Sequence, residues 1–127
     1  MIQTRYIEHH RYSRLLDHLS GDAASQRRFV LDFVSLWTPR TERLQQALAT
    51  NNLQDADVVL LSIRSSSTMI GAMMLEAAAG LIHSAVKRRD VAGAEKHLAR
   101  LYELGGLTCA ELLWILEHPE PAGTSAS

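Results

Sequence analysis

The sequence predicts an all-α fold: an antiparallel up-and-down bundle of four helices, with additional helices toward the N-terminal and C-terminal ends. Residues that favour helix (leucine, alanine, arginine and glutamate) are abundant, whereas the alternation of valine, isoleucine and threonine typical of strands is scarce. Only three prolines occur in the chain. The predicted helices follow one another through short loops, and short loops join helices that lie antiparallel.

The composition indicates one globular domain. A length of 127 residues is enough to bury a core, and the apolar share of 46% and charged share of 21% are those of a soluble protein. We expect the domain to span residues 1–117. The segment 118–127 is rich in proline, serine and glycine and lacks core residues, so we expect it to be mobile.

Charge and hydropathy exclude several classes of partner. The net charge of −1 gives no field that attracts nucleic acid or an anionic membrane. No run of about 18 apolar residues is present, and the first residues lack the apolar core of a signal peptide. Cys109 is the single cysteine, so no disulfide forms within the chain. Together these features predict a cytoplasmic protein.

The N-terminal half contains two or three predicted helices. The first covers Thr4–Leu19. Asp22 is placed to cap the second, Ala23–Leu36, whose apolar residues recur at helical spacing. Thr38-Pro39 then either starts a separate helix or bends one long helix that continues through Arg40–Thr50.

The C-terminal half begins with a central helix, Asp55–Ile70, which Gly71 separates from a helix over Ala72–Arg89. Asp90 is then a plausible cap for a helix over Val91–Leu104.

The chain is predicted to end in a short helix. Gly105-Gly106 is expected to stop the preceding helix, because glycine is a poor helix former. The last helix then covers Thr108–Glu117.

The central helix divides into two faces at 100° per residue. The inner face collects Ala56, Val59, Leu60, Ile63, Ser66, Ser67 and Ile70. The outer face collects Asp57, Leu61, Arg64, Ser65 and Thr68. Leu61 is thus an apolar residue within a polar stripe, bordered by Arg64 and Ser65 three and four positions later. An apolar spot beside a guanidinium and hydroxyls suits a protein contact better than a catalytic site.

The stretch VLLSIRSSSTMIGA, from Val59 to Ala72, resembles the signature helix of histidine-phosphotransfer (HPt) domains. That family carries the pattern His-x-x-Lys-Gly-Ser, followed by Gly-Ala at the start of the next helix. Aligned on Gly71-Ala72, the pattern places Leu61 at the histidine, Arg64 at the lysine, Ser65 at the glycine and Ser66 at the serine. The resemblance extends from about Leu15 to Leu116, with the Asp90 turn in register.

The resemblance implies a phosphotransfer site without its nucleophile. In the family an exposed histidine receives a phosphoryl group from a receiver-domain aspartate, and a nearby cation offsets the phosphoryl charge. Arg64 is the residue that matches this cation, but Leu61 has no nucleophilic atom. The serine hydroxyls nearby have no adjacent base to activate them. Ser65 adds a side chain where the family keeps glycine. We therefore predict no enzymatic activity, no metal and no cofactor.

The resulting hypothesis is a pseudo-HPt module of a bacterial two-component phosphorelay. It would bind a response-regulator receiver domain, or a histidine kinase, without carrying phosphate. The predicted partner-binding residues are Leu61, Arg64, Ser65 and Thr68, with Asp57 at the edge.

Two alternatives remain open. One is an active phosphotransfer protein that uses another histidine, His83 or His97, each seven residues from Asp90 and thus opposite one another in a helical hairpin. We expect both to be structural residues on the surface or half-buried, since two histidines alone do not form a zinc site. The other is a helical adaptor or dimerisation domain unrelated to phosphorelays. A buried Leu61, or helices from Asp55 to Leu104 that do not share one bundle, would favour it.

Overall fold

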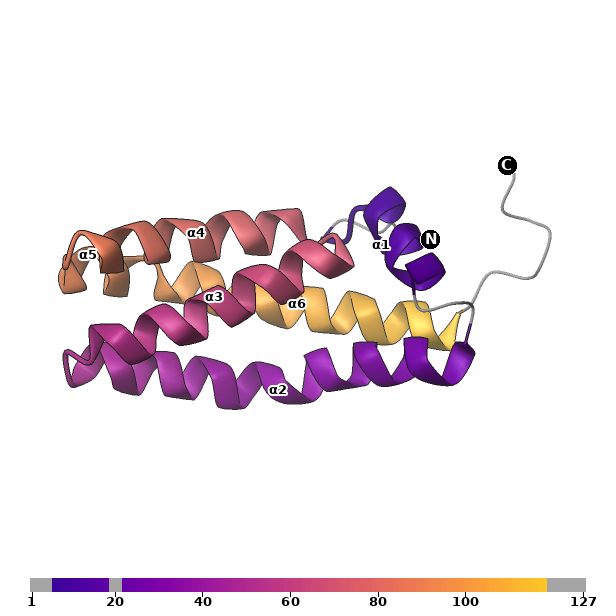
Figure 1. The fold of residues 1–127 in the computed structure, drawn as a ribbon, viewed down its shortest axis with the longest axis horizontal. Coiled ribbons are helices and arrows are strands. Elements are labelled where there is room, and N and C mark those ends of the chain that lie inside the picture. Colours follow the sequence, from indigo (N-terminus) through magenta and orange to yellow (C-terminus); the bar gives the residue numbers. More distant parts are fainter. Residues whose placement is uncertain (1–5, 19–21, 119–127) are drawn as a thin grey trace.

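The computed structural model of the chain describes residues 6–18 and 22–118, which form six α-helices and, within these ranges, no strand (Figure 1). The predicted all-α class is therefore confirmed. The predicted mobile tail lies outside the described residues except for His118, as does the start of the predicted first helix. The helices are α1 (His9–His18), α2 (Ala23–Ala49), α3 (Leu53–Ile70), α4 (Met73–Lys87), α5 (Val91–Lys96) and α6 (Leu98–Glu117).

Four long helices form the bundle. Helix α2 packs against α3 and α6, and α4 packs against the same two helices, so that the four enclose one core. Consecutive long helices run in opposite directions, and the short α5 links α4 to α6 at one end (Figure 1). The largest fully buried side chains come from all four helices and include Leu44, Leu60, Ile82 and Leu101. No helix in the described part of the chain is long and apolar enough to cross a membrane.

Helix α2 is continuous through Pro39, so the two segments predicted on either side form one helix. Proline lacks the N–H that would complete a backbone hydrogen bond at this turn. Trp37 and Leu44 are buried on either side of it, so packing against the core holds the helix together across the interruption. Asp22 caps the helix as predicted, accepting a hydrogen bond from the backbone N–H of Ala24 at 3.0 Å.

The prediction that Gly105-Gly106 ends a helix is wrong: α6 runs through both glycines to Glu117. A Cβ atom on Gly105 would lie 1.7 Å from Cζ2 of Trp37, in a space that the indole ring occupies. Gly105 therefore provides clearance between α6 and α2. The predicted last helix is the C-terminal half of α6.

The predicted helix Val91–Leu104 is divided at His97, which ends α5 and begins α6. Asp90 caps α5 as expected, with its carboxylate 2.9 Å from the backbone nitrogen of Gly93.

Helix α1 begins at His9, later than the predicted Thr4. The residue before it, Glu8, caps its first turn. The Glu8 carboxylate accepts hydrogen bonds from the backbone N–H groups of His10 and Arg11, and these contacts, His10 first, lower the pKa of Glu8. The backbone N–H of Glu8 donates to the carbonyl of Gly71 at 2.6 Å. Tyr6 and Ile7 therefore lie outside the helix, and the N–H of Tyr6 donates to Glu111 at 2.8 Å.

Gly71 fixes the position of α1 against the α3–α4 turn. Its φ of +79° is the left-handed conformation that ends α3, which favours glycine. A Cβ atom there would also lie 2.7 Å from the carbonyl oxygen of Glu8 and 3.0 Å from Cβ of Arg11. Both the turn and the close approach of α1 thus require glycine.

Candidate docking site

Helix α3 has the two faces that its sequence predicts. Of the inner-face residues, only Ser66 is not fully buried. Leu61 lies on the outer face and is 54% exposed. Val58, one turn earlier, is also exposed, so the two side chains form a small apolar spot. A buried Leu61 would have favoured an unrelated adaptor, and the structure does not show that.

The five predicted site residues lie along one side of α3. Leu61, Ser65 and Thr68 are exposed, and Asp57 and Arg64 are half-buried. We call these five residues the docking stripe. At its C-terminal end, Thr68 borders an open hollow between α3 and α1 that Arg11, Arg14, Leu15 and Met69 also line.

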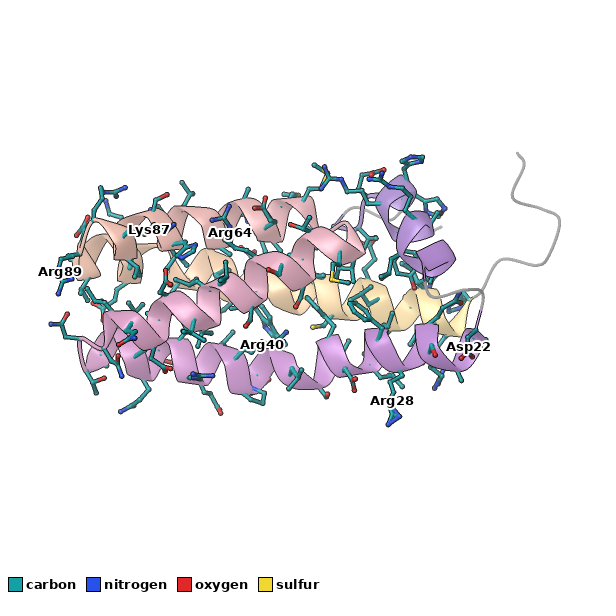
Figure 2. The ribbon with its side chains drawn as sticks, viewed as in Figure 1. Asp22, Arg28, Arg40, Arg64, Lys87 and Arg89 are labelled. Atoms are coloured by element: carbon teal, nitrogen blue, oxygen red, sulfur yellow. The ribbon has the colours of Figure 1, made fainter. Side chains whose placement is uncertain are left out.

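Two residues of the docking stripe, Asp57 and Arg64, form a polar chain with two residues of α4, His83 and Glu76. Oδ1 of Asp57 lies 2.6 Å from Nε2 of His83, and Nη1 of Arg64 lies 3.1 Å from the other ring nitrogen, Nδ1. Arg64 also donates from Nη2 and Nε to Oε2 of Glu76, at 3.2 Å and 3.4 Å. Figure 2 shows Arg64 between the ribbons of α3 and α4.

These contacts fix the protonation form of His83. A guanidinium carries only donors, so Nδ1 of His83 must accept the hydrogen bond from Arg64. The ring proton is then on Nε2 and is donated to Asp57. The imidazole is neutral, uses both nitrogens and is only 3% exposed. It therefore has no nitrogen free to attack a phosphoryl group.

The guanidinium of Arg64 lies next to Gly80 of α4. A Cβ atom on Gly80 would be 3.8 Å from Cζ of the guanidinium, at ordinary van der Waals contact. Arg64 remains 38% exposed, but its charge is paired with Glu76. The cation that the resemblance assigns to this position is thus already neutralised within the protein.

The expectation that His83 is on the surface or half-buried is wrong, and Glu76 and Gly80 were not predicted as part of the site. The three residues share the flank of α4 that faces α3, as their spacing of three and four positions allows. That spacing was visible in the sequence. What it could not show is that this flank meets Asp57 and Arg64.

The remaining candidate nucleophiles and ligands do not join this site. His97 lies at the junction of α5 and α6, and the hydrogen bonds of His83 go to Asp57 and Arg64. Burial raises the pKa of Cys109 to about 11, so its thiol stays protonated near neutral pH and is a poor nucleophile. In the described ranges no three histidine, cysteine or acidic side chains are grouped to hold a metal ion.

No family model matches the sequence, and neither a curated protein nor a solved structure matches the chain.

Proposed function

We propose that this chain is a pseudo-HPt module of bacterial two-component signalling, which binds a receiver domain through the docking stripe and carries no phosphate. The observation that supports this most directly is the exposed Leu61. It stands at the histidine position of an HPt-like signature, on the outer face of a helix within a four-helix bundle. An apolar side chain there keeps a contact surface for the partner but has no atom that could accept a phosphoryl group.

The surroundings of Leu61 support docking over phosphotransfer. A phosphoryl group brought to Leu61 meets no nucleophile, because His83 is buried, and the guanidinium of Arg64 is already paired with Glu76. A protein surface, in contrast, gains apolar contact with Leu61 and hydrogen-bonding groups at Ser65 and Thr68. A receiver domain is the partner that the resemblance favours, and a histidine kinase is the second.

The proposal is tested by measuring binding of the full chain to a panel of purified receiver domains from the same organism. We expect at least one to bind, and Leu61→Ala to weaken its binding about tenfold, because the substitution removes the apolar centre of the contact. Leu113→Ala is the matched control, since Leu113 is also exposed but lies on α6, and it should leave the affinity unchanged. Binding to none of the receivers, or equal effects of the two variants, would contradict the proposal.

The same panel tests the phosphotransfer alternative. Receivers labelled with phosphate should transfer no label to the wild-type chain. Transfer that is lost in His83→Ala or His97→Ala would overturn the pseudo-HPt proposal in favour of an active carrier.

A gain-of-function pair tests the role of Glu76. Leu61→His supplies an exposed imidazole, but Arg64 remains neutralised by the Glu76 carboxylate. We therefore expect Leu61→His/Glu76→Gln to accept about ten times more label from a phosphorylated receiver than Leu61→His alone, because the freed guanidinium stabilises the transferred charge. Glu76→Gln by itself is the control and should accept none. Equal labelling of the single and double histidine variants would show that Glu76 does not limit Arg64.

A further inference from the structure

We infer that His83 is a positioning residue of the docking stripe. It lies behind the stripe, and its imidazole holds Asp57 on one side of Leu61 and Arg64 on the other. The inference rests on the proposed function, because it explains how the same surface is prepared for its partner.

The first step in the argument is the difference in burial within the polar chain. His83 is 3% exposed, whereas the side chains of Asp57 and Arg64 are 46% and 38% exposed. Side chains that are so exposed normally sample several rotamers, and ordering them on binding costs free energy. A contact to a rigid buried ring removes that freedom before the partner arrives. The two charged groups of the stripe are therefore preorganised.

The second step is the direction in which His83 holds them. Asp57 and Arg64 are seven residues apart on α3, a rise of about 10 Å along the helix axis, with Leu61 between them. The stripe thus has a fixed order: carboxylate, apolar side chain, guanidinium. Glu76 and His83 occupy three N–H groups of Arg64 and leave two for a partner. A complementary protein surface has an apolar side chain with a cationic group toward Asp57 and a neutral hydrogen-bond acceptor toward the two remaining N–H groups of Arg64, and it docks in one orientation.

The third step is the donor and acceptor that His83 must supply. Its neutral ring donates from Nε2 to Asp57 and accepts at Nδ1 from Arg64. A glutamine side chain also carries a donating group, the amide NH2, beside an accepting amide oxygen, and it is not protonated near neutral pH. Leucine has a similar size and neither group. The pair His83→Gln and His83→Leu therefore separates positioning from filling of the core.

The test measures affinity of these variants for the receiver domain that binds the wild-type chain most tightly. We expect His83→Leu to weaken binding about fivefold, because Asp57 loses its hydrogen bond to the ring and Arg64 keeps only its contacts with Glu76. His83→Gln should stay within about twofold of wild type. Val86→Ala is the control for a purely structural role. Val86 is buried on the same helix, so its truncation should lower the unfolding temperature without changing the affinity.

Two results would overturn the inference. One is an unchanged affinity of folded His83→Leu for the receiver. If Leu61→Ala still weakens binding, the proposed function stands and only the positioning role fails.

The other result is the protonation form of His83, which is measured on the wild-type chain without a partner. Imidazole ¹⁵N chemical shifts of the wild-type chain at pH 7 should show His83 protonated on Nε2 alone, and an imidazolium or the Nδ1–H form would contradict the hydrogen bonds on which the inference depends. Failure of every receiver to bind counts against the proposed function, and these shifts then decide whether the polar chain exists.

Discussion

Gly105→Ala is expected to lower the free energy of unfolding by about 3 kcal/mol, the upper part of the range for overpacked cores. The new methyl carbon would lie 1.7 Å from Cζ2 of Trp37, and the indole ring is buried between α2 and α6. Moving the two helices apart would disturb the rest of the core, because α2 also packs against α3, and α6 against α4. This loss outweighs the gain of up to about 1 kcal/mol that alanine brings to a helix interior.

Urea denaturation of Gly105→Ala and Gly106→Ala measures this effect with a control one residue away. Gly106 is on the same helix, and a Cβ atom there meets nothing within 4 Å. Gly106→Ala should therefore be more stable than wild type by about 0.5–1 kcal/mol, through helix propensity alone. Similar stability changes in the two variants would mean that the glycines do act together as a local feature of α6, and that Trp37 does not pack as described.

Gly71→Ala is expected to cost about 2–3 kcal/mol and to loosen α1. Part of the cost is the left-handed backbone at φ +79°, which a residue with a side chain adopts at about 1–2 kcal/mol. The rest comes from the carbonyl oxygen of Glu8, which would lie 2.7 Å from the new Cβ atom. The simplest relief is a shift of α1, which breaks the hydrogen bond from Glu8 to Gly71.

Hydrogen exchange distinguishes this displacement from a uniform loss of stability. In Gly71→Ala the backbone amides of α1 should lose protection far more than those of α3 and α4. Gly80→Ala is the control, because its new methyl group would be at normal contact distance from Arg64 and its backbone is helical. That variant should keep the protection of α1. Unchanged exchange in α1 of Gly71→Ala would show that the helix does not depend on this glycine.

Features that depend on neighbouring residues in the chain were predictable. The two faces of α3 follow from helical periodicity, and the exposure of Leu61 follows with them. Asp22 and Asp90 cap helices because an aspartate side chain reaches a backbone N–H two or three residues later. These predictions needed no knowledge of which helix packs where.

The wrong predictions concern residues whose structure depends on contacts with a distant part of the chain. A pair such as Gly105-Gly106 is typical of a helix end, but the role of Gly105 is set by Trp37 on another helix. The predicted first helix begins too early. The helix starts later because the backbone N–H of Glu8 donates to the carbonyl of Gly71. In each case a contact with another helix or turn outweighed the local preference. The neighbouring residues in the sequence do not show which part of the chain makes that contact.

The candidate site shows the same division. Helical periodicity was enough to place Asp57, Leu61 and Arg64 on one face of α3. The ion pair of Arg64 with Glu76, and the link from Asp57 to Arg64 through buried His83, depend on how α3 packs against α4. The physical reason is range: periodicity acts within one helix, whereas hydrogen bonds and burial depend on which flank of α4 meets α3.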